Sequence, residues 1–279
     1  MGYPILAREV LADRVKKLVV SAPLIAKKRR AGQFIILRTT DAGERIPLTI
    51  ADADAVAGTL TLIFQEVGKS TFELGEMYPG QELADLCGPL GKPTHIEQKG
   101  TVVVVGGGIG VAPVHPIAQA MKQIGNTVLG IIGARTKELL IMEAEMAKIC
   151  DKLYITTDDG SYGTHGFVTD VLRVLIAEND VKEVVAIGPV PMMNACCKVT
   201  LETNTPTLVS LNPIMVDGTG MCGACRVTVG GRTRFVCVDG PEFNGHEVDF
   251  KELMLRQRQY LPQEQESLTM YRSHHQQHA

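Results

Sequence analysis

The sequence contains no tryptophan, few aromatic residues, no excess charge of either sign and no long hydrophobic run. Aromatic residues make up 5% of the 279 residues, and 28 Lys and Arg against 31 Asp and Glu give a net charge of −3. This balance provides no broad basic surface, so we expect no nucleic-acid partner. Apolar runs such as 101–105 are far too short to span a bilayer, and the first residues lack a signal-peptide pattern. We therefore expect a cytoplasmic protein without a membrane association.

Cysteine occurs seven times, an odd number that excludes complete internal disulfide pairing. Three of the seven lie in one Gly-rich stretch: Cys222, Cys225 and Cys237. A reducing compartment with metal-bound thiolates fits this distribution better than a secreted disulfide scaffold. The other four suit the interior as small hydrophobic side chains. They are Cys87, Cys150, Cys196 and Cys197.

The hydrophobic pattern changes between residues 93 and 101. Up to Pro93, short apolar runs separated by Gly, Pro and Asp predict a small antiparallel β-barrel. From Thr101, apolar strands alternate with helical segments, which predicts a doubly wound parallel sheet. We expect helices over 112–124, 137–148 and 167–178, and strands over 102–105, 127–133, 153–157 and 183–188.

The fold class is therefore β plus α/β, with four segments. We expect a β-barrel domain over 1–98, an α/β domain over 99–210, a small cysteine-containing subdomain over 211–260 and a polar tail over 261–279. The tail ends in His274, His275 and His278, and we expect it to be solvated, with no assigned function.

The cysteine-rich stretch has the spacing of an iron–sulfur site. Counted from Asp217 it is D-x4-C-x2-C-x11-C, and plant-type [2Fe–2S] proteins use C-x4-C-x2-C…C. Glycines in the stretch allow the backbone conformations and free amide groups that a loop around a cluster needs. The sequence thus predicts Asp217, Cys222, Cys225 and Cys237 as iron ligands. A structural zinc ion would use the same four residues, and a redox-active thiol set would use the three cysteines alone.

A Gly-rich turn follows the first strand of the α/β segment. Residues 106–113 read Gly-Gly-Gly-Ile-Gly-Val-Ala-Pro and lead into an expected helix. Glycines let a nucleotide approach the backbone, and a helix N-terminus favours its pyrophosphate. The turn departs from G-x-G-x-x-G, so on its own it would equally serve packing. The candidate nucleotide-binding residues here are Gly106, Gly107, Gly108, Gly110, Ala112 and Pro113.

Together with three further motifs, this turn resembles the ferredoxin–NADP reductase superfamily. The motifs are Gly133-Ala134-Arg135, the segment 158–163 that begins Asp-Asp-Gly, and 188–193, which is similar to the signature G-P-x-x-M. The resemblance implies nucleotide contacts from Arg135, Asp158, Asp159, Gly160, Gly188, Pro189 and Met192.

Two segments of the barrel region resemble the flavin-binding motifs of the same superfamily. Residues 46–49 stand where the superfamily has R-x-[YF]-[ST], and 68–71 resemble its second flavin segment. The first segment departs from the pattern, because Ile46 takes the Arg position, with Arg45 one residue early, and Leu48 replaces the aromatic residue. The resemblance implies flavin contacts from Arg45, Pro47, Leu48, Thr49, Ile63, Phe64, Gln65, Gly68, Ser70 and Thr71.

The order of flavin barrel, nucleotide domain and C-terminal cluster is similar to the electron-transfer subunits of class B dihydroorotate dehydrogenase. That family normally supplies four cysteines. Asp217 with three cysteines more closely resembles the small subunits of NADH-dependent ferredoxin:NADP oxidoreductases, also called sulfide dehydrogenase subunit beta. The resemblance extends over residues 1 to 260.

The resemblance implies FAD, one [2Fe–2S] cluster and NAD(H) as cofactors. It also implies a heterodimer with a larger subunit that carries a second flavin and [4Fe–4S] clusters, and through which ferredoxin would react in electron bifurcation. We expect no catalytic side chain, because such cofactors perform the chemistry. The alternatives are the electron-transfer subunit of an NAD-dependent dihydroorotate dehydrogenase and a redox-sensing metal protein.

The choice between the two nicotinamide nucleotides depends on three side chains. Asp158 and Asp159 would repel a 2′-phosphate and favour NAD(H), whereas Arg135 argues for NADP(H). We expect NAD(H), with NADP(H) as the alternative.

Overall fold

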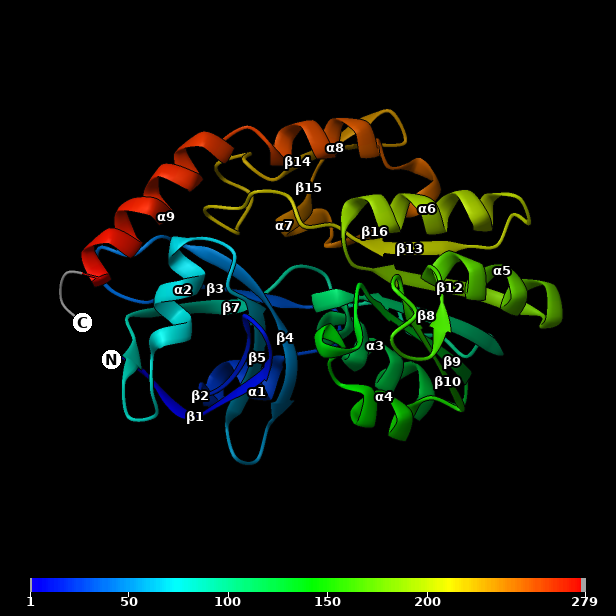
Figure 1. The fold of residues 1–279 in the computed structure, drawn as a ribbon, viewed down its shortest axis with the longest axis horizontal. Coiled ribbons are helices and arrows are strands. Elements are labelled where there is room, and N and C mark those ends of the chain that lie inside the picture. Colours follow the sequence, from blue (N-terminus) through cyan, green and yellow to red (C-terminus); the bar gives the residue numbers. More distant parts are fainter. Residues whose placement is uncertain (1, 277–279) are drawn as a thin grey trace.

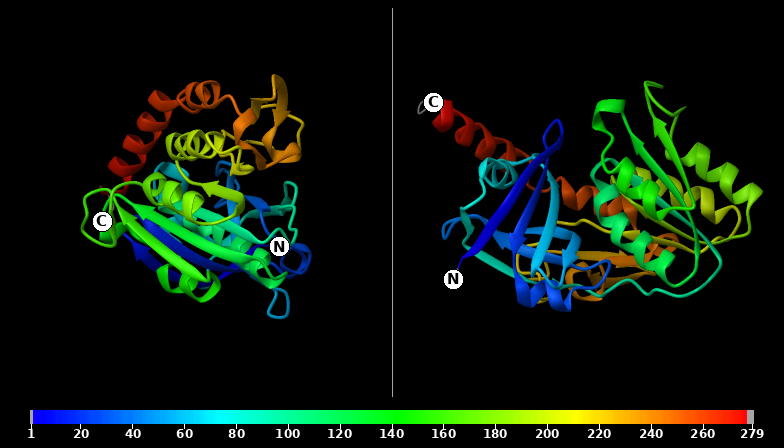
Figure 2. Two further views of the ribbon diagram at one scale, coloured as in Figure 1. Left: turned by 90° about the vertical axis from the view of Figure 1, so that its right-hand side faces the viewer. Right: turned by 90° about the horizontal axis from the view of Figure 1, so that it is seen from below.

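A computed structural model describes residues 2–276, and Met1 and residues 277–279, including His278, lie outside it (Figure 1). Two seven-stranded sheets lie side by side (Figures 1 and 2). A smaller region over 211–260, called the cysteine region because it contains Cys222, Cys225 and Cys237, covers one side of both sheets (Figures 1 and 2). Among the described residues, no helix combines the length and the apolar character needed to cross a membrane.

The first sheet is antiparallel throughout, in the order β6-β1-β2-β5-β4-β3-β7, and forms a near-closed barrel. Its interior is filled by aliphatic and aromatic side chains such as Leu18, Ile35, Leu62 and Phe64. The predicted barrel is confirmed. Its elements are β1 (Tyr3–Ala12), β2 (Val15–Ser21), α1 (Pro23–Lys28), β3 (Phe34–Arg38), β4 (Ile46–Asp54), β5 (Thr59–Gln65), α2 (Lys69–Glu76), β6 (Glu82–Leu83) and β7 (Asp85–Leu90).

The second sheet has the order β11-β10-β9-β8-β12-β13-β16 and is parallel except at its last strand. Helices cover both faces, as predicted for a doubly wound fold (Figure 1). Its strands are β8 (Thr101–Gly107), β9 (Thr127–Ala134), β10 (Lys152–Thr157), β11 (Thr164–His165), β12 (Val181–Ile187), β13 (Thr207–Ser210) and β16 (Glu242–Asn244). Its helices are η1 (Gly108–Gly110), α3 (Val111–Gln123), η2 (Lys137–Leu139), α4 (Glu143–Ile149), α5 (Val168–Glu178) and α6 (Val190–Leu201).

The valines of β8 explain why this strand lies at the centre of the sheet. Val102 and Val104 point into the core beneath α3, while Val103 and Val105 point into the core beneath α5 and α6. A strand buried on both faces needs a continuous apolar run, because successive side chains point to opposite faces.

The cysteine region contains one hairpin, two short α-helices and one 3-10 helix. The elements are β14 (Arg226–Val229), β15 (Arg232–Phe235), α7 (Val236–Asp239), η3 (Gly245–Glu247) and α8 (Phe250–Gln257). The strand β16 also comes from this region, but it pairs antiparallel with β13 and so completes the second sheet. The predicted parallel sheet is confirmed, and β16 adds one antiparallel strand at its edge.

One expected helix needs correction. The helix predicted over 137–148 is broken, because Met142 has a left-handed backbone (φ 58°) and α4 begins only after it. Most of the described side chains of the polar tail are exposed, as expected, and its backbone forms helix α9 (Leu261–Gln276), which extends from the cysteine region to the barrel (Figure 2). There, Tyr271 Oη donates a 2.5 Å hydrogen bond to Glu76, and Arg272 lies over the Phe72 ring of α2.

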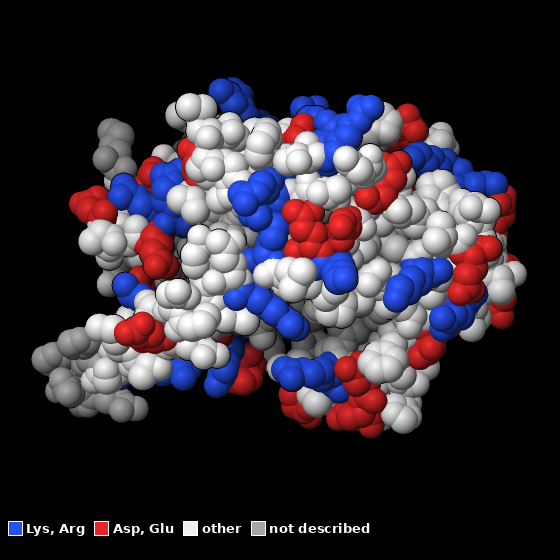
Figure 3. All heavy atoms as spheres, turned by 90° about the horizontal axis from the view of Figure 1, so that it is seen from above, with Lys and Arg blue, Asp and Glu red and all other residues white. Residues whose placement is uncertain are grey.

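Acidic and basic side chains alternate on the face of the molecule that carries the cysteine region and α6 (Figure 3). Among the described residues, no continuous basic surface is visible on this face. This distribution agrees with the small net charge of the whole chain.

Candidate functional site

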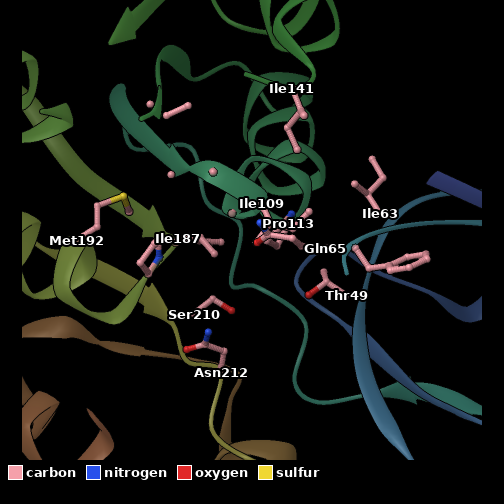
Figure 4. A pocket seen from close by; sticks show the side chains of 18 of the residues that line it. Thr49, Ile63, Gln65, Ile109, Pro113, Ile141, Ile187, Met192, Ser210 and Asn212 are labelled. Carbon is pink, nitrogen blue, oxygen red and sulfur yellow. The ribbon is translucent and has the colours of Figure 1, made fainter. Parts of the chain in front are cut away.

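A large cavity of about 1060 Å³ opens between the barrel and the second sheet. One wall comes from β4, β5 and the start of α2, and the other from the Gly-rich turn and the carboxyl ends of the parallel strands (Figure 4). Ligands of open α/β sheets bind at the carboxyl ends of the strands. The cavity therefore lies where the predicted flavin and nucleotide segments meet.

Most of the predicted flavin residues line the barrel wall of this cavity. Three of them lie on β4, where Pro47 and Thr49 pair with Ile36 and Phe34 of β3. The predicted residues that line the cavity are Pro47, Leu48, Thr49, Ile63, Phe64, Gln65 and Thr71.

The hydroxyl groups at the start of α2 have different surroundings. Thr71 Oγ1 lines the cavity, donates to the Gly68 carbonyl (2.8 Å) and accepts from the backbone N–H groups of Val67 and Gly68. Ser70 Oγ instead donates to Glu44 Oε2 at 2.5 Å. Gly68, Ser70 and Arg45 are not among the residues that line the cavity.

The glycines of the Gly-rich turn serve two purposes. A Cβ atom on Gly110 would overlap the Ile187 carbonyl, so this glycine lets the start of α3 approach the end of β12. A Cβ atom on Gly106 would press on Val111, so this glycine lets β8 and α3 pack closely. Gly108 has φ 53°, and a Cβ atom there would meet no other atom within 4 Å, so its backbone faces open space. Gly107, Gly108, Gly110 and Pro113 line the cavity, whereas Ala112 is buried behind it.

Of the polar groups predicted for the nucleotide, Arg135 and Asp158 line the cavity. Asp159 does not, because its carboxylate accepts hydrogen bonds from the Ser161 hydroxyl (2.6 Å) and N–H (3.0 Å). These bonds hold the pKa of Asp159 below its usual value. Gly160 packs against His165 instead. The predicted residues Gly188, Pro189 and Met192 line the same wall.

Sequence reasoning missed the contribution of the segment after β13. Ser210 and Asn212 line the cavity and lie on the side of Ile187 and Met192, with Thr49 and Gln65 on the other (Figure 4). Polar residues at the carboxyl end of a parallel strand were the available signal.

The second candidate site is the cysteine loop. The sulfur atoms of Cys225 and Cys237 lie 3.2 Å apart, and both residues are buried, whereas Cys222 is exposed. Burial and the neighbouring Cys225 raise the pKa of Cys237 to about 12. Backbone N–H groups of Ala224 and Asp217 lower the pKa of Cys222.

The Asp217 carboxylate is hydrogen-bonded to residues that follow it in the chain. Its Oδ2 accepts from the Thr219 N–H (2.8 Å), the Thr219 hydroxyl (2.5 Å) and the Met221 N–H (3.2 Å). These bonds hold the pKa of Asp217 below its usual value. Within residues 2–276, no three His, Cys, Asp or Glu side chains are arranged around one metal position.

The donor set nevertheless fits an iron–sulfur group. Three thiols and one carboxylate lie within residues 217–237, where the Gly220 N–H points to Cys237 and the Ala224 N–H to Cys222. Thiols crowded in this way need a cation to ionise together, and amide hydrogen bonds to sulfur are typical of such clusters. The Asp217 carboxylate, whose Oδ2 is bonded to Thr219 and Met221, would supply the fourth ligand.

Comparison with known proteins gives two family matches. Residues 104–198 match the oxidoreductase NAD-binding domain, and residues 212–249 match the iron–sulfur cluster binding domain of dihydroorotate dehydrogenase B. The two matched regions contain the Gly-rich turn and the cysteine loop, respectively.

Similar proteins extend along nearly the whole chain. The dihydroorotate dehydrogenase B electron transfer subunit homolog of Thermotoga maritima is 48% identical over 91% of this chain and 90% of its own length. The electron transfer subunit of Bacillus caldolyticus is 35% identical over 87% and 95%. A chain of the NADH-dependent reduced ferredoxin-NADP oxidoreductase structure, described for flavin-based electron bifurcation, is 45% identical over 97% and 98%, with a TM-score of 0.92.

Proposed function

Because this chain belongs to the family of dihydroorotate dehydrogenase B electron transfer subunits and their homologues, we propose that it exchanges hydride with NAD(H) through FAD and passes single electrons to a partner subunit through a [2Fe–2S] cluster. The family resemblance predicted from the motifs is confirmed, and the chain is an oxidoreductase subunit with an NAD-binding and an iron–sulfur domain.

The observation that carries this proposal is the cavity shared by the two sheets. The barrel contributes Pro47, Leu48 and Thr49 to one wall, and the Gly-rich turn and Gly188 contribute to the other. Its volume of about 1060 Å³ lies at the upper end of ordinary ligand pockets. Such a space suits two ring systems stacked across the gap between the sheets.

Each set of residues has a binding task. When bound, flavin accepts a two-electron hydride and releases single electrons, which the cluster carries one at a time. Residues 47–49 would line the flavin ring, and the amide groups at the start of α2 would face its pyrophosphate. Gly108 would admit the nucleotide pyrophosphate, and Met192 would border the nicotinamide. The iron ligands would be Asp217, Cys222, Cys225 and Cys237. These tasks divide the chain into a flavin domain over 1–98, a nucleotide domain over 99–210 and a cluster subdomain over 211–260.

The partner that we propose is a larger subunit with a second flavin and [4Fe–4S] clusters, as in an NADH-dependent ferredoxin:NADP oxidoreductase. The 45% identity over 97% of the chain and Asp217 at the first ligand position favour this assignment. Ferredoxin would then react with the partner and not with this chain. The names of several relatives favour a second candidate, a partner that oxidises dihydroorotate.

Anaerobic co-purification tests the proposal. We expect yellow-brown protein with one FAD and about two irons per chain, together with a larger iron–sulfur flavoprotein, and NADH should bleach the flavin faster than NADPH. A dihydroorotate-oxidising partner would select the second candidate. Colourless protein that contains zinc and no flavin would refute both and support a metal-dependent sensor.

A further inference from the structure

Arg45 connects the barrel to the cysteine loop. Its Nε donates to the Val216 carbonyl at 3.2 Å, and its Nη2 donates to the Asp217 carbonyl at 3.4 Å. The third nitrogen, Nη1, lies 3.0 Å from Asp85 Oδ2 at the start of β7. One guanidinium group therefore joins a carboxylate of the barrel to the two residues that lead into the loop.

Gly218 makes the second contact between this loop and the barrel. A Cβ atom at this position would lie 2.7 Å from Ile36 Cγ1 and 3.0 Å from Leu90 Cδ1, and its φ is 82°. The backbone of the loop is therefore seated directly on side chains of β3 and β7. Only glycine permits both this approach and this backbone conformation without strain.

The other end of the loop is held by its own region. Arg256 of α8 donates to the Ala224 carbonyl at 3.0 Å, and Arg226 of β14 donates to the Gly223 carbonyl at 3.3 Å. The contacts of Arg45 and Gly218 with the barrel therefore attach the loop at its Asp217 end. Its attachment point is close to the cavity, because Pro47, two residues after Arg45, lines the cavity wall.

We propose that Arg45 is a positioning residue that fixes the Asp217 end of the cysteine loop to the flavin-side wall and raises the reduction potential of the bound cluster. This inference rests on the proposed function, since it requires a cluster. A reduced cluster holds one more negative charge than the oxidised cluster, and a nearby guanidinium stabilises that charge. Net charge and hydrogen bonding around the sulfur atoms are known determinants of cluster potentials.

Arg38 provides a matched control. Its Nε lies 3.7 Å from the same Asp85 carboxylate, but its Nη1 donates to the Asp41 carbonyl and not to the cysteine loop. R45Q removes the charge and the link to the loop, whereas R38Q removes a charge beside Asp85 and leaves the link in place. R45K restores the charge without the three-way geometry.

The experiment is a potentiometric titration of the purified full-length complex, followed by EPR of the reduced cluster. We expect R45Q to lower the cluster midpoint potential and change its EPR line shape, R45K to recover part of the potential, and R38Q to match the wild type. Loss of iron from R45Q, with FAD retained and iron retained in R38Q, also supports a positioning role.

A wild-type chain without iron would refute the proposed function itself. With iron present, an unchanged potential and spectrum in R45Q, or an equal shift in R38Q, would overturn the inference about Arg45. If R45Q does not fold, R45K decides. A lowered cluster potential or a changed cluster spectrum in R45K supports the inference, and a wild-type potential and spectrum overturn it.

Discussion

The sulfur atoms of Cys225 and Cys237 lie 3.2 Å apart although eleven residues separate them in the chain. The hairpin of β14 and β15 produces this approach, because its outermost pair joins Arg226 to Phe235. Cys225 immediately precedes this pair, and Cys237 follows it on α7. The spacing between the last two predicted ligands is therefore the length of one antiparallel hairpin.

Replacing one of these two sulfurs should remove the cluster. We expect C225S to lose most of its iron and visible absorbance while it keeps FAD, because a buried hydroxyl is a poor iron ligand. C150S is the control, since Cys150 is buried in the nucleotide domain beside Gly130. Iron and flavin analysis of both variants is the measurement, and equal iron in C225S and C150S would contradict the ligand assignment.

Asp217 could act as an iron ligand or could only shape the loop, and the variant D217N separates these two roles. In D217N the amide oxygen still accepts hydrogen bonds from Thr219 and Met221, but the anionic ligand is lost. We expect the loop to keep its conformation while iron occupancy falls or the EPR spectrum changes. Iron content and spectrum identical to the wild type would show that Asp217 only shapes the loop.

Two glycines of the Gly-rich turn should respond differently to substitution. G110A should destabilise the protein by about 3 kcal/mol, because its Cβ meets the rigid Ile187 backbone. G108N should remain within about 1 kcal/mol of the wild type, because Asn tolerates the left-handed conformation and the space beside it is open. We expect G108N to weaken NADH binding at least tenfold, or ~1.4 kcal/mol.

Thermal unfolding and NADH titration of both variants check this difference. A G108N protein with wild-type affinity for NADH would contradict the placement of the nucleotide pyrophosphate at this turn.

Asp158 should contribute to the choice between NADH and NADPH. Asp158 lines the cavity, as Arg135 does, so its carboxylate would repel a 2′-phosphate. We expect D158N to raise the NADPH to NADH ratio of flavin reduction roughly tenfold, a change of ~1.4 kcal/mol. D159N is the control, because Asp159 is bonded to Ser161 and does not line the cavity. Equal ratios in the two variants would remove Asp158 from the specificity argument.

Glu242 should make stability depend on pH. Burial raises its pKa to about 7, opposed by the 2.7 Å hydrogen bond from the Thr94 hydroxyl and assisted by the charge of Glu183. The unfolded chain has a pKa of about 4.3 at this residue, so the folded protein binds more protons between these values and loses stability as pH rises through them.

The variant E242Q keeps the oxygen that accepts from Thr94 and removes the titration. We compare the free energy of unfolding of E242Q with that of the wild type at each pH. We expect this difference to favour E242Q by about 2 kcal/mol more at pH 8 than at pH 5. Denaturant unfolding at the two pH values measures it. A difference that does not vary with pH would mean that Glu242 ionises normally in the folded protein.

The central features of fold and site could be predicted because their signals are local. The valines of β8 specify a strand buried on both faces, and the spacing from Asp217 to Cys237 identifies the cysteine loop. Neither conclusion requires knowledge of distant parts of the chain.

The remaining features depend on contacts between distant residues. Strand β16 has only three residues and is defined by its pairing with β13, and the contact of Arg45 with Val216 spans 171 positions. Helix α9 has no apolar stripe that would predict burial, and its contacts with α2 come from Tyr271 and Arg272. Met142 is a further case, because a left-handed methionine has no sequence signal.

The edge strand β16 has a consequence for how this protein can be divided. A boundary near residue 211 separates the Gly-rich turn from Cys222, Cys225 and Cys237, yet it cuts through one hydrogen-bonded sheet. Removal of everything after Ser210 would expose the backbone of β13 as a new sheet edge, which invites association between chains. The iron–sulfur segment therefore cannot be removed or exchanged as an independent unit, because it supplies the last strand of the nucleotide-binding sheet.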